Sequence, residues 1–186
     1  MSKQLQGVKV AVLATMGVEQ IELTAPRQAL DEAGATTHLV SPQAGTIKAL
    51  QFPDWGDEFS VDVLLNESDP AQYQALYLPG GIINPDLLRI NSDAVRFVKA
   101  SFEVGKPVAT MCHGLWMLIE ADVVEGRTVT SWLSLRKDLI NAGANWIDQA
   151  VVIDNDLITA RNPGDIPEFA PKVVELFASK VIGVTV

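Results

Sequence analysis

Cysteine and histidine are scarce in this sequence, which has one cysteine and two histidines in 186 residues. A single cysteine excludes an internal disulfide, and these three residues leave no paired CxxC and no HExxH motif of the kind that binds zinc. The chain also lacks the glycine-rich patterns GxGxxG and GxxxxGK[ST], so nucleotide binding has no support. We therefore expect neither a metal site nor a bound cofactor.

Positive charge and long apolar runs are also lacking. Fourteen lysines and arginines stand against 23 aspartates and glutamates, which gives a net charge of −9 and disfavours binding to nucleic acids or anionic membranes. No apolar run approaches the roughly 20 residues that a membrane span needs. The first residues, MSKQLQG, do not resemble a secretory signal. We expect a cytoplasmic protein that binds neither nucleic acid nor membranes.

Hydrophobic residues, by contrast, are plentiful at 48% of the chain, enough for a well-filled core. There is no internal repeat, low-complexity tract or linker composition, so residues 1–186 are predicted to form one domain.

Short apolar segments typical of strands alternate with amphipathic segments typical of helices. The expected strands are 8–14, 37–40, 75–78, 107–111, 128–130, 151–153 and 157–160. The expected helices are 24–34, 93–103, 114–121, 135–142 and a last helix with Phe169, Val173, Leu176 and Phe177 on one face. This order predicts an α/β, three-layer, doubly wound and mostly parallel sheet of the flavodoxin-like type, with a small antiparallel hairpin at 151–160. Residues 47–61 have a mixed pattern that fits either a hairpin or an irregular excursion.

The scarce residues meet in ATMCHG, residues 109–114, where Cys112 follows a predicted strand. Ligands of doubly wound sheets bind beyond the carboxyl ends of strands, and a tight turn there lifts a nucleophile above the sheet. Gly114 gives the turn room, and the start of the next helix favours the reactive thiolate. The alternative is that Cys112 is a small buried apolar residue. His113 offers either its ring or its backbone N–H, whereas His38, inside a predicted strand, is interpreted as structural.

The segment Pro79-Gly80-Gly81 ends the strand expected beside that of Cys112. The backbone N–H of Gly81 could donate to an oxyanion together with that of His113. The alternative is a plain tight turn that requires a positive φ.

Five segments of the sequence, taken together, resemble the PfpI intracellular protease family. They are GVEQIELTAP, LYLPGGIINPDLLR, GKPVATMCHG, EGRTVTSW and LINAGANWIDQAVVID. That family belongs to the superfamily of the parkinsonism-associated protein deglycase, and the resemblance runs from about residue 8 to about residue 177. It implies that Cys112 is the nucleophile, that Glu22 lies beside its sulfur, and that Gly81 and His113 supply the oxyanion amides. Glu19 is the less suitable acid of its segment.

The resemblance also implies an acidic residue that reaches the histidine of a neighbouring subunit. Asp86 is the candidate, although the chain has one more residue between Gly81 and this Pro-Asp pair than the family pattern. If Asp86 serves, catalysis requires a homodimer or a larger homo-oligomer. Trp132 stands where the protease branch commonly has an aromatic hydroxyl, and because indole is only a donor we expect it, with Gly80, to line a pocket. Trp116 and Trp146 are interpreted as packing residues, and Trp55 as either.

Charge constrains the role of Glu22. An ionised Glu22 would raise the pKa of an adjacent thiol, whereas a protonated Glu22 would donate a hydrogen bond to a thiolate. We predict that burial keeps Glu22 protonated.

The sequence thus predicts a cysteine-dependent hydrolase, acting on a peptide or on a glycated, glyoxal-derived adduct, with a role in stress response. The alternatives are a redox sensor or chaperone that uses a reactive Cys112, and a binding module that uses the same crevice. Amidotransferase chemistry is excluded because it needs a histidine late in the chain, and none follows His113.

Overall fold

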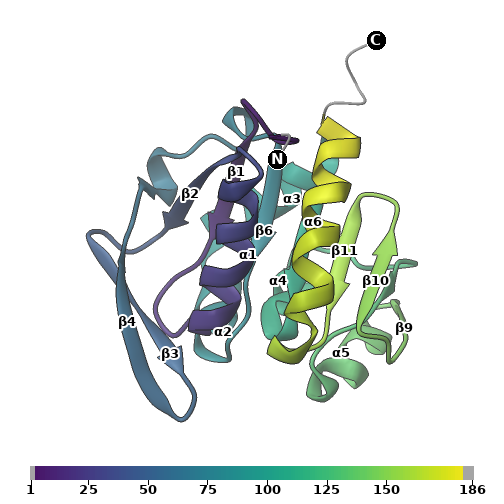
Figure 1. Ribbon diagram of the computed structural model, residues 1–186. Helices are drawn as coiled ribbons and strands as arrows, with labels where there is room; N and C mark the ends of the chain where they lie inside the picture. The colour runs from purple at the N-terminus through teal and green to yellow at the C-terminus, as the bar shows by residue number, and fades with distance from the viewer. Residues whose placement is uncertain (1–2, 182–186) are drawn as a thin grey trace.

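A computed structural model describes residues 3–181 and contains a central seven-stranded sheet (Figure 1). The strand order is β10-β11-β7-β6-β1-β2-β5, and every neighbouring pair is parallel except β10–β11. These strands are β1 (Lys9–Leu13), β2 (Thr36–Ser41), β5 (Val63–Leu64), β6 (Ala75–Leu78), β7 (Val108–Met111), β10 (Val151–Asp154) and β11 (Leu157–Ala160). The predicted mostly parallel sheet and the antiparallel hairpin at 151–160 are both confirmed.

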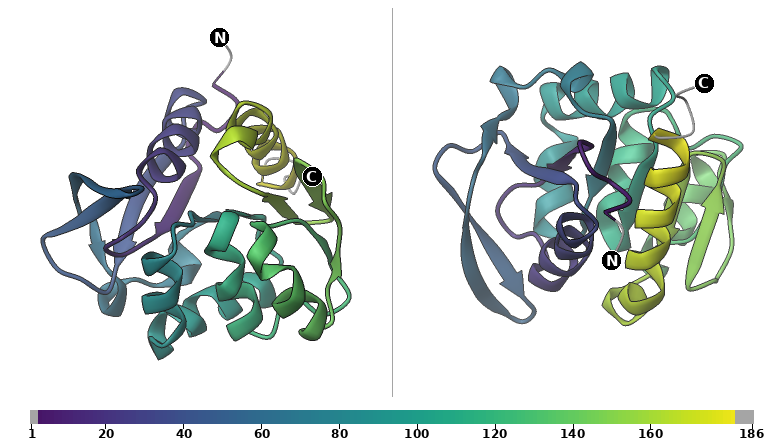
Figure 2. Two further views of the ribbon diagram at one scale, coloured as in Figure 1. Left: turned by 90° about the horizontal axis from the view of Figure 1, so that it is seen from below. Right: turned by 45° about the horizontal axis from the view of Figure 1, so that its top comes forward.

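Helices cover both faces of this sheet, as the left view of Figure 2 shows. One face carries α1 (Gln20–Glu32) and α6 (Ile166–Val181), and the other carries α2 (Ile83–Arg89), α3 (Ser92–Glu103), α4 (Trp116–Glu120) and α5 (Arg136–Asn141). The alternation of side chains along β1 supplies both cores. Val10 and Val12 pack in the core under α1 and α6, whereas Ala11 and Leu13 pack in the core on the other side. The three-layer prediction is therefore confirmed.

The start of α1 differs from the expectation. The helix begins at Gln20 rather than at residue 24, and Pro26 lies inside it instead of in its first turn. Proline has no N–H to donate to the carbonyl four residues earlier, which is that of Glu22. The hydroxyl of Tyr77 on β6 donates to this carbonyl instead, at 2.6 Å. The sheet thus supplies the hydrogen bond that the helix lacks.

Two other helices depart from the sequence pattern. The sequence analysis did not anticipate α2, a short helix with Pro85 in its first turn. The helix expected at 114–121 divides into a 3₁₀ turn, Cys112–Leu115, followed by α4. Both departures bring helical backbone close to the carboxyl ends of β6 and β7.

Residues 47–61 form a hairpin of β3 (Thr46–Gln51) and β4 (Asp54–Ser60), which is separate from the seven-stranded sheet. Figure 1 shows it projecting on the left of the molecule. Backbone hydrogen bonds from Gly17 to Lys48 (2.8 Å) and from Leu50 to Val18 (2.7 Å) attach it to the segment between β1 and α1. These bonds bring the hairpin turn to the end of the sheet where β1 finishes.

A second small sheet pairs β8 (Thr128–Val129) with β9 (Asn145–Trp146) in parallel. None of the helices within residues 3–181 has both the length and the apolar character needed to cross a membrane.

Candidate active site

The segments that follow β1, β6 and β7 meet at the carboxyl end of the sheet, and Cys112 lies at their centre. Cys112 has a φ of +57°, a left-handed conformation that is uncommon for residues other than glycine. The chain turns there from β7 into the 3₁₀ turn. A Cβ at Gly114 would lie 2.5 Å from the Thr110 hydroxyl oxygen and 2.7 Å from the Leu78 carbonyl oxygen, so glycine is required at this position. The expected tight turn is present.

The Cys112 side chain lines a cavity of about 380 Å³ and is itself only 6% exposed. The cavity is lined by Glu19, Glu22, Leu50, Phe52, Gly81, Ile82, Cys112, His113, Trp132 and Pro163. Trp132 therefore lies where the sequence analysis placed it. The hairpin residues Leu50 and Phe52, together with Ile82 and Pro163, are additional, because no local motif marks them.

Glu22 lies beneath the sulfur and is fully buried. Its Oε2 accepts a hydrogen bond from the Gly80 N–H at 2.8 Å, while Oε1 has no hydrogen-bond partner within residues 3–181. The Cys112 thiol lies close enough to this carboxyl to affect its pKa. Burial raises the pKa of Glu22 from 4.5 to about 7. The carboxyl is therefore poised to hold or release a proton near neutral pH, next to the sulfur.

The sequence analysis expected Gly80 to line the cavity. Gly80 instead lies behind the cavity wall, against Glu22 and Cys112. A Cβ at this position would lie 2.5 Å from Glu22 Oε2 and 2.8 Å from Cys112 Cβ. The absence of a side chain at Gly80 is what allows the carboxyl and the thiol to approach each other.

Cys112 and Glu22 titrate as a coupled pair. Burial and then the charge of Glu22 raise the pKa of the Cys112 thiol above its ordinary value, while the backbone N–H groups of His113 and Gly81 act in the opposite direction. This corrects the expectation that the start of a helix by itself favours the thiolate, since α4 is short and burial dominates. The pair accommodates one negative charge far more readily than two, so a thiolate requires a protonated Glu22.

The His113 ring lies beside the sulfur, with Nδ1 3.3 Å from Cys112 Sγ. Burial lowers the pKa of His113 from 6.5 to about 4, so the ring is neutral at neutral pH and can accept a proton. Its Nε2 lies 3.4 Å from the Ser134 hydroxyl, Trp132 stacks on it at 6.0 Å between ring centroids, and Trp116 meets it edge-on at 5.1 Å. Sequence reasoning missed Ser134, because an exposed serine 21 residues away carries no local signal.

The backbone N–H groups of Gly81 and His113 both reach the Cys112 sulfur. Gly81 has a φ of +82°, and a Cβ there would lie 2.6 Å from both the Glu19 nitrogen and the Gly17 carbonyl oxygen. The positive φ is thus a structural requirement that also orients an amide towards the site. An oxygen anion formed on a carbonyl bound at the sulfur would meet two donors.

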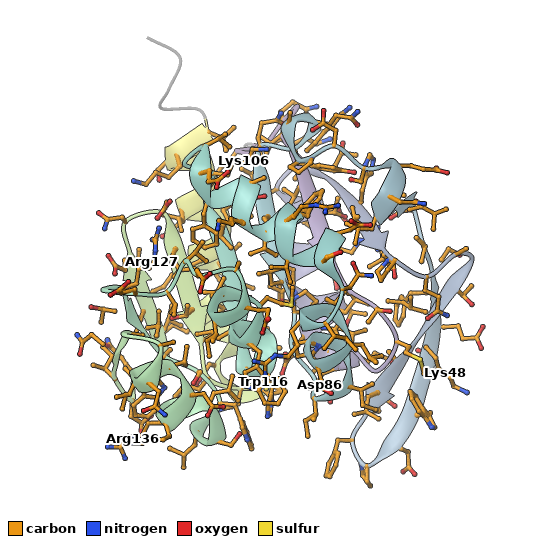
Figure 3. The ribbon with its side chains drawn as sticks, turned by 180° about the vertical axis from the view of Figure 1, so that it is seen from behind. Lys48, Asp86, Lys106, Trp116, Arg127 and Arg136 are labelled. Atoms are coloured by element: carbon orange, nitrogen blue, oxygen red, sulfur yellow. The ribbon has the colours of Figure 1, made fainter. Side chains whose placement is uncertain are left out.

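The remaining candidates lie away from the cavity. Asp86 is exposed in the first turn of α2, and within residues 3–181 its side chain makes no hydrogen bond with the His113 of its own chain. Figure 3 shows Asp86 and Trp116 on the same side of the molecule. A role for Asp86 across an interface stays a prediction.

The other aromatic candidates have structural contacts. Trp116 donates to Asp138 at 3.3 Å, and Trp146 donates to Ser131 at 2.9 Å, as expected of packing residues. His38 contacts the Tyr73 hydroxyl at 3.2 Å. Trp55 is half exposed on β4. In the part of the chain that the structure describes, no three His, Cys, Asp or Glu side chains gather as a group that could hold a metal ion.

Several known proteins are similar to this chain over most of its length. A deglycase of Thermococcus kodakarensis is 40% identical over 169 residues, covering 91% of this chain and 99% of the relative. Deglycase PfpI of Pyrococcus furiosus is 38% identical with the same coverage. YraA of Bacillus subtilis, whose name describes a candidate cysteine protease, is 39% identical over 161 residues, covering 87% of this chain and 93% of that protein.

Solved structures share the fold. Drosophila melanogaster DJ-1beta superposes with a TM-score of 0.84 at 25% identity, covering 99% of this chain and 96% of its own. A two-domain protein from Anabaena variabilis, with DJ-1/ThiJ/PfpI-like and ferritin-like domains, has a TM-score of 0.84 at 34% identity over 90% of this chain and 49% of its own. The sequence profile of the DJ-1/PfpI family matches residues 8–176. A match of this extent, shared with relatives near 40% identity, makes this protein a member of the DJ-1/PfpI family.

Proposed function

We propose that this protein is a cysteine-dependent hydrolase that acts on carbonyl compounds, with glycated or glyoxal-derived adducts as the first substrate class and peptides as the second. The observation that carries the proposal is the position of Cys112 Sγ between the Glu22 carboxyl and the His113 ring, with two backbone N–H groups directed at it. The names of the relatives, two deglycases and a candidate cysteine protease, support the same reaction type. Removal of carbonyl damage would give the protein a role in stress response.

In the proposed reaction the sulfur attacks the substrate carbonyl carbon while the proton of the pair resides on Glu22. A C–S bond forms, the carbonyl π electrons move to oxygen, and the Gly81 and His113 N–H groups stabilise this anion. When the attacked carbon also carries the leaving amine, as in a peptide, the tetrahedral intermediate collapses, the C–N bond breaks, and Glu22 gives its proton to that amine. Neutral His113 then accepts a proton from the water that attacks the acyl-enzyme. The C–S bond breaks, the acid product leaves, and the proton on His113 returns to the Cys112–Glu22 pair.

Turnover by the wild type and by Cys112→Ser tests this proposal, with ester, peptide and methylglyoxal-adduct substrates. Turnover that disappears in Cys112→Ser, while circular dichroism stays unchanged, is the expected result. Absence of turnover by the wild type on all three classes would contradict it. A sensor role receives no specific support, because the relatives' names describe deglycases and a candidate cysteine protease.

We also propose that the active form is a cytoplasmic homodimer or larger homo-oligomer, in which Asp86 approaches the His113 of a neighbouring copy. The exposure of Asp86 at the start of α2 supports this proposal. Mixing an inactive Cys112→Ser chain with an Asp86→Asn chain tests it, because an intact pair would form across the interface and restore activity. If Asp86→Asn alone retains full activity, the proposal is wrong.

A further inference from the structure

The side chains that line the cavity include acidic residues but no strongly basic ones. Apart from Cys112 and His113, its ionisable side chains are Glu19 and Glu22, and no lysine or arginine lines it. The other side chains are apolar, namely Leu50, Phe52, Ile82, Trp132 and Pro163. A bound substrate therefore meets hydrophobic walls and negative charge, with no cation to pair with an anionic group.

Glu19 differs from Glu22 in its surroundings. It is the residue before α1, its side chain does not cap the helix, and it is only partly buried. Its carboxyl is within hydrogen-bonding reach of the Phe52 N–H, which links it to the turn of the β3–β4 hairpin. Within residues 3–181 Glu19 forms no salt bridge. Its charge is therefore not neutralised by the protein and acts on whatever enters the cavity.

Aromatic rings accompany this carboxylate at the same cavity. Phe52 is 74% exposed and Trp132 is 43% exposed although both line the cavity, so each presents part of its ring to solvent. Aromatic faces attract cations as well as apolar groups. A carboxylate combined with exposed rings favours a ligand that carries an apolar body and a positive charge.

We propose that Glu19 is a specificity-determining residue that selects cationic and neutral carbonyl substrates with an apolar group and rejects anionic ones. Where the selected molecule is a substrate, this inference rests on the proposed hydrolase function. The selection itself is a property of the cavity, because a carboxylate near a partly desolvated site attracts a cation and repels an anion more strongly than it would in water. Glu19 does not take part in the bond changes, which belong to Cys112, Glu22 and His113.

Charged thiol reagents of similar size test this selection without any hydrolysis. We would use the trimethylammonioethyl, hydroxyethyl and sulfonatoethyl methanethiosulfonates, which are cationic, neutral and anionic. In each reaction a disulfide bond forms between Cys112 Sγ and the thioalkyl sulfur, the S–S bond of the reagent breaks, methanesulfinate leaves with the electron pair, and the thiol proton passes to the buffer. Because burial raises the pKa of Glu19, the rates would be measured near pH 8, well above the ordinary range of glutamate.

The rates are divided by those of a free thiol, which removes the intrinsic reactivity of each reagent. For the wild type at low ionic strength we expect the normalised ratio of cationic to anionic rates to be about tenfold or more. In Glu19→Gln this ratio should fall by about fivefold, and Glu19→Asp should restore most of it. The matched control is Glu103→Gln, which removes the same charge from the exposed last residue of α3, in a segment that does not line the cavity.

An unchanged ratio in Glu19→Gln, or an equal fall in Glu103→Gln, would overturn the proposal. Thermal unfolding of each variant shows that it is folded, and if Glu19→Gln is not, Glu19→Ala removes the same charge and should lower the ratio to the same extent. A failure of the proposed hydrolase function would appear differently, as missing turnover with the charge ratio intact. If turnover is found, kcat/KM for matched cationic and anionic esters should follow the reagent ratios.

Discussion

The buried floor of the site and its exposed rim are built in different ways. On the floor, Gly80 and Cys112 follow the ends of the adjacent parallel strands β6 and β7, and Glu22 comes from the first turn of α1. The hydrogen bond from Gly80 to Glu22 is 2.8 Å long, and both Glu22 and Cys112 are shielded from water. On the rim, Phe52 and Trp132 come from a hairpin turn and a connecting segment, and both are substantially exposed. The comparison suggests a division of the proposed function, in which the sheet and α1 position the reacting groups and the segments outside the sheet select the ligand. Changes to the floor should therefore affect stability and chemistry together, and changes to the rim should affect selection alone.

Gly80→Ala should break the floor most severely. The new Cβ would overlap Glu22 Oε2 and Cys112 Cβ, so the carboxyl and thiol must separate. We expect a loss of about 1–3 kcal/mol in the free energy of unfolding, as for other overpacked cores, and a loss of most activity. Denaturant unfolding and turnover would measure both.

Gly45→Ala is the matched control, because its Cβ would meet nothing within 4 Å although its φ is +81°. It should cost only about 1 kcal/mol and leave activity unchanged. Equal effects of the two substitutions would show that the floor has room that the structure does not indicate.

Glu22 on the floor and the neighbouring His113 ring should have opposite effects on how the free energy of unfolding depends on pH. Burial raises the pKa of Glu22 from 4.5 to about 7, so the folded state binds more protons than the unfolded state in this window, and stability falls as pH rises through it. Burial lowers the pKa of His113 from 6.5 to about 4, so the unfolded state binds more protons there, and stability falls as pH drops through that window. Each contribution is on the order of 3 kcal/mol, and they nearly cancel between pH 4.5 and 6.5.

Single variants should reveal the two contributions separately. In Glu22→Gln the free energy of unfolding should rise with pH between about 4 and 6.5, whereas in His113→Gln it should fall between about 4.5 and 7. Denaturant titrations at several pH values would measure these slopes. Parallel profiles in the wild type and both variants would contradict the assigned burial effects.

Tyr77→Phe should weaken the support of the floor without touching the reacting groups. It removes the hydroxyl that donates to the Glu22 carbonyl, and Pro26 cannot replace that donor. A buried acceptor left unpaired costs about 1–3 kcal/mol, and activity should fall because the start of α1 carries the carboxyl. Tyr73→Phe, which loses a contact to His38 instead, should leave activity unchanged. A drop in activity in both variants would mean that the effect is not specific to α1.

Phe52→Ala should have the smallest effect on the free energy of unfolding. It should also show most clearly that a change at the rim alters substrate selection and leaves the floor unchanged. Its side chain is 74% exposed, so the free energy of unfolding should change by less than about 0.5 kcal/mol. The value of kcat/KM for substrates with an apolar group should fall by about threefold to tenfold, because a wall of the cavity is lost. The rate at which a small neutral reagent alkylates Cys112 should remain unchanged. A slower rate would mean that Phe52, like the floor residues, affects the reactivity of the sulfur.

The floor could largely be predicted from the sequence because its signals are local. Cys112 follows an apolar strand, Gly81 follows a proline and a glycine, and the resemblance to a family assigned Glu22. The rim could be predicted only in part. The resemblance placed Trp132 at the pocket, whereas Phe52 at the rim and Ser134 beside the His113 ring reach the site through contacts between distant segments. The early start of α1 could not be predicted for a related reason. A proline usually indicates the first turn of a helix, but it can lie further inside when another element supplies the missing hydrogen-bond donor, as Tyr77 does here.

At Cys112 the left-handed backbone conformation favours glycine, whereas the proposed chemistry needs the cysteine side chain. Glycine would adopt this conformation at no steric penalty, while any side chain here costs on the order of 1 kcal/mol or more. Attempts to make the protein more heat-resistant by screening position 112 would therefore tend to select glycine, which lacks the proposed nucleophile. A useful stabilisation campaign should keep this residue fixed and look for gains elsewhere in the molecule.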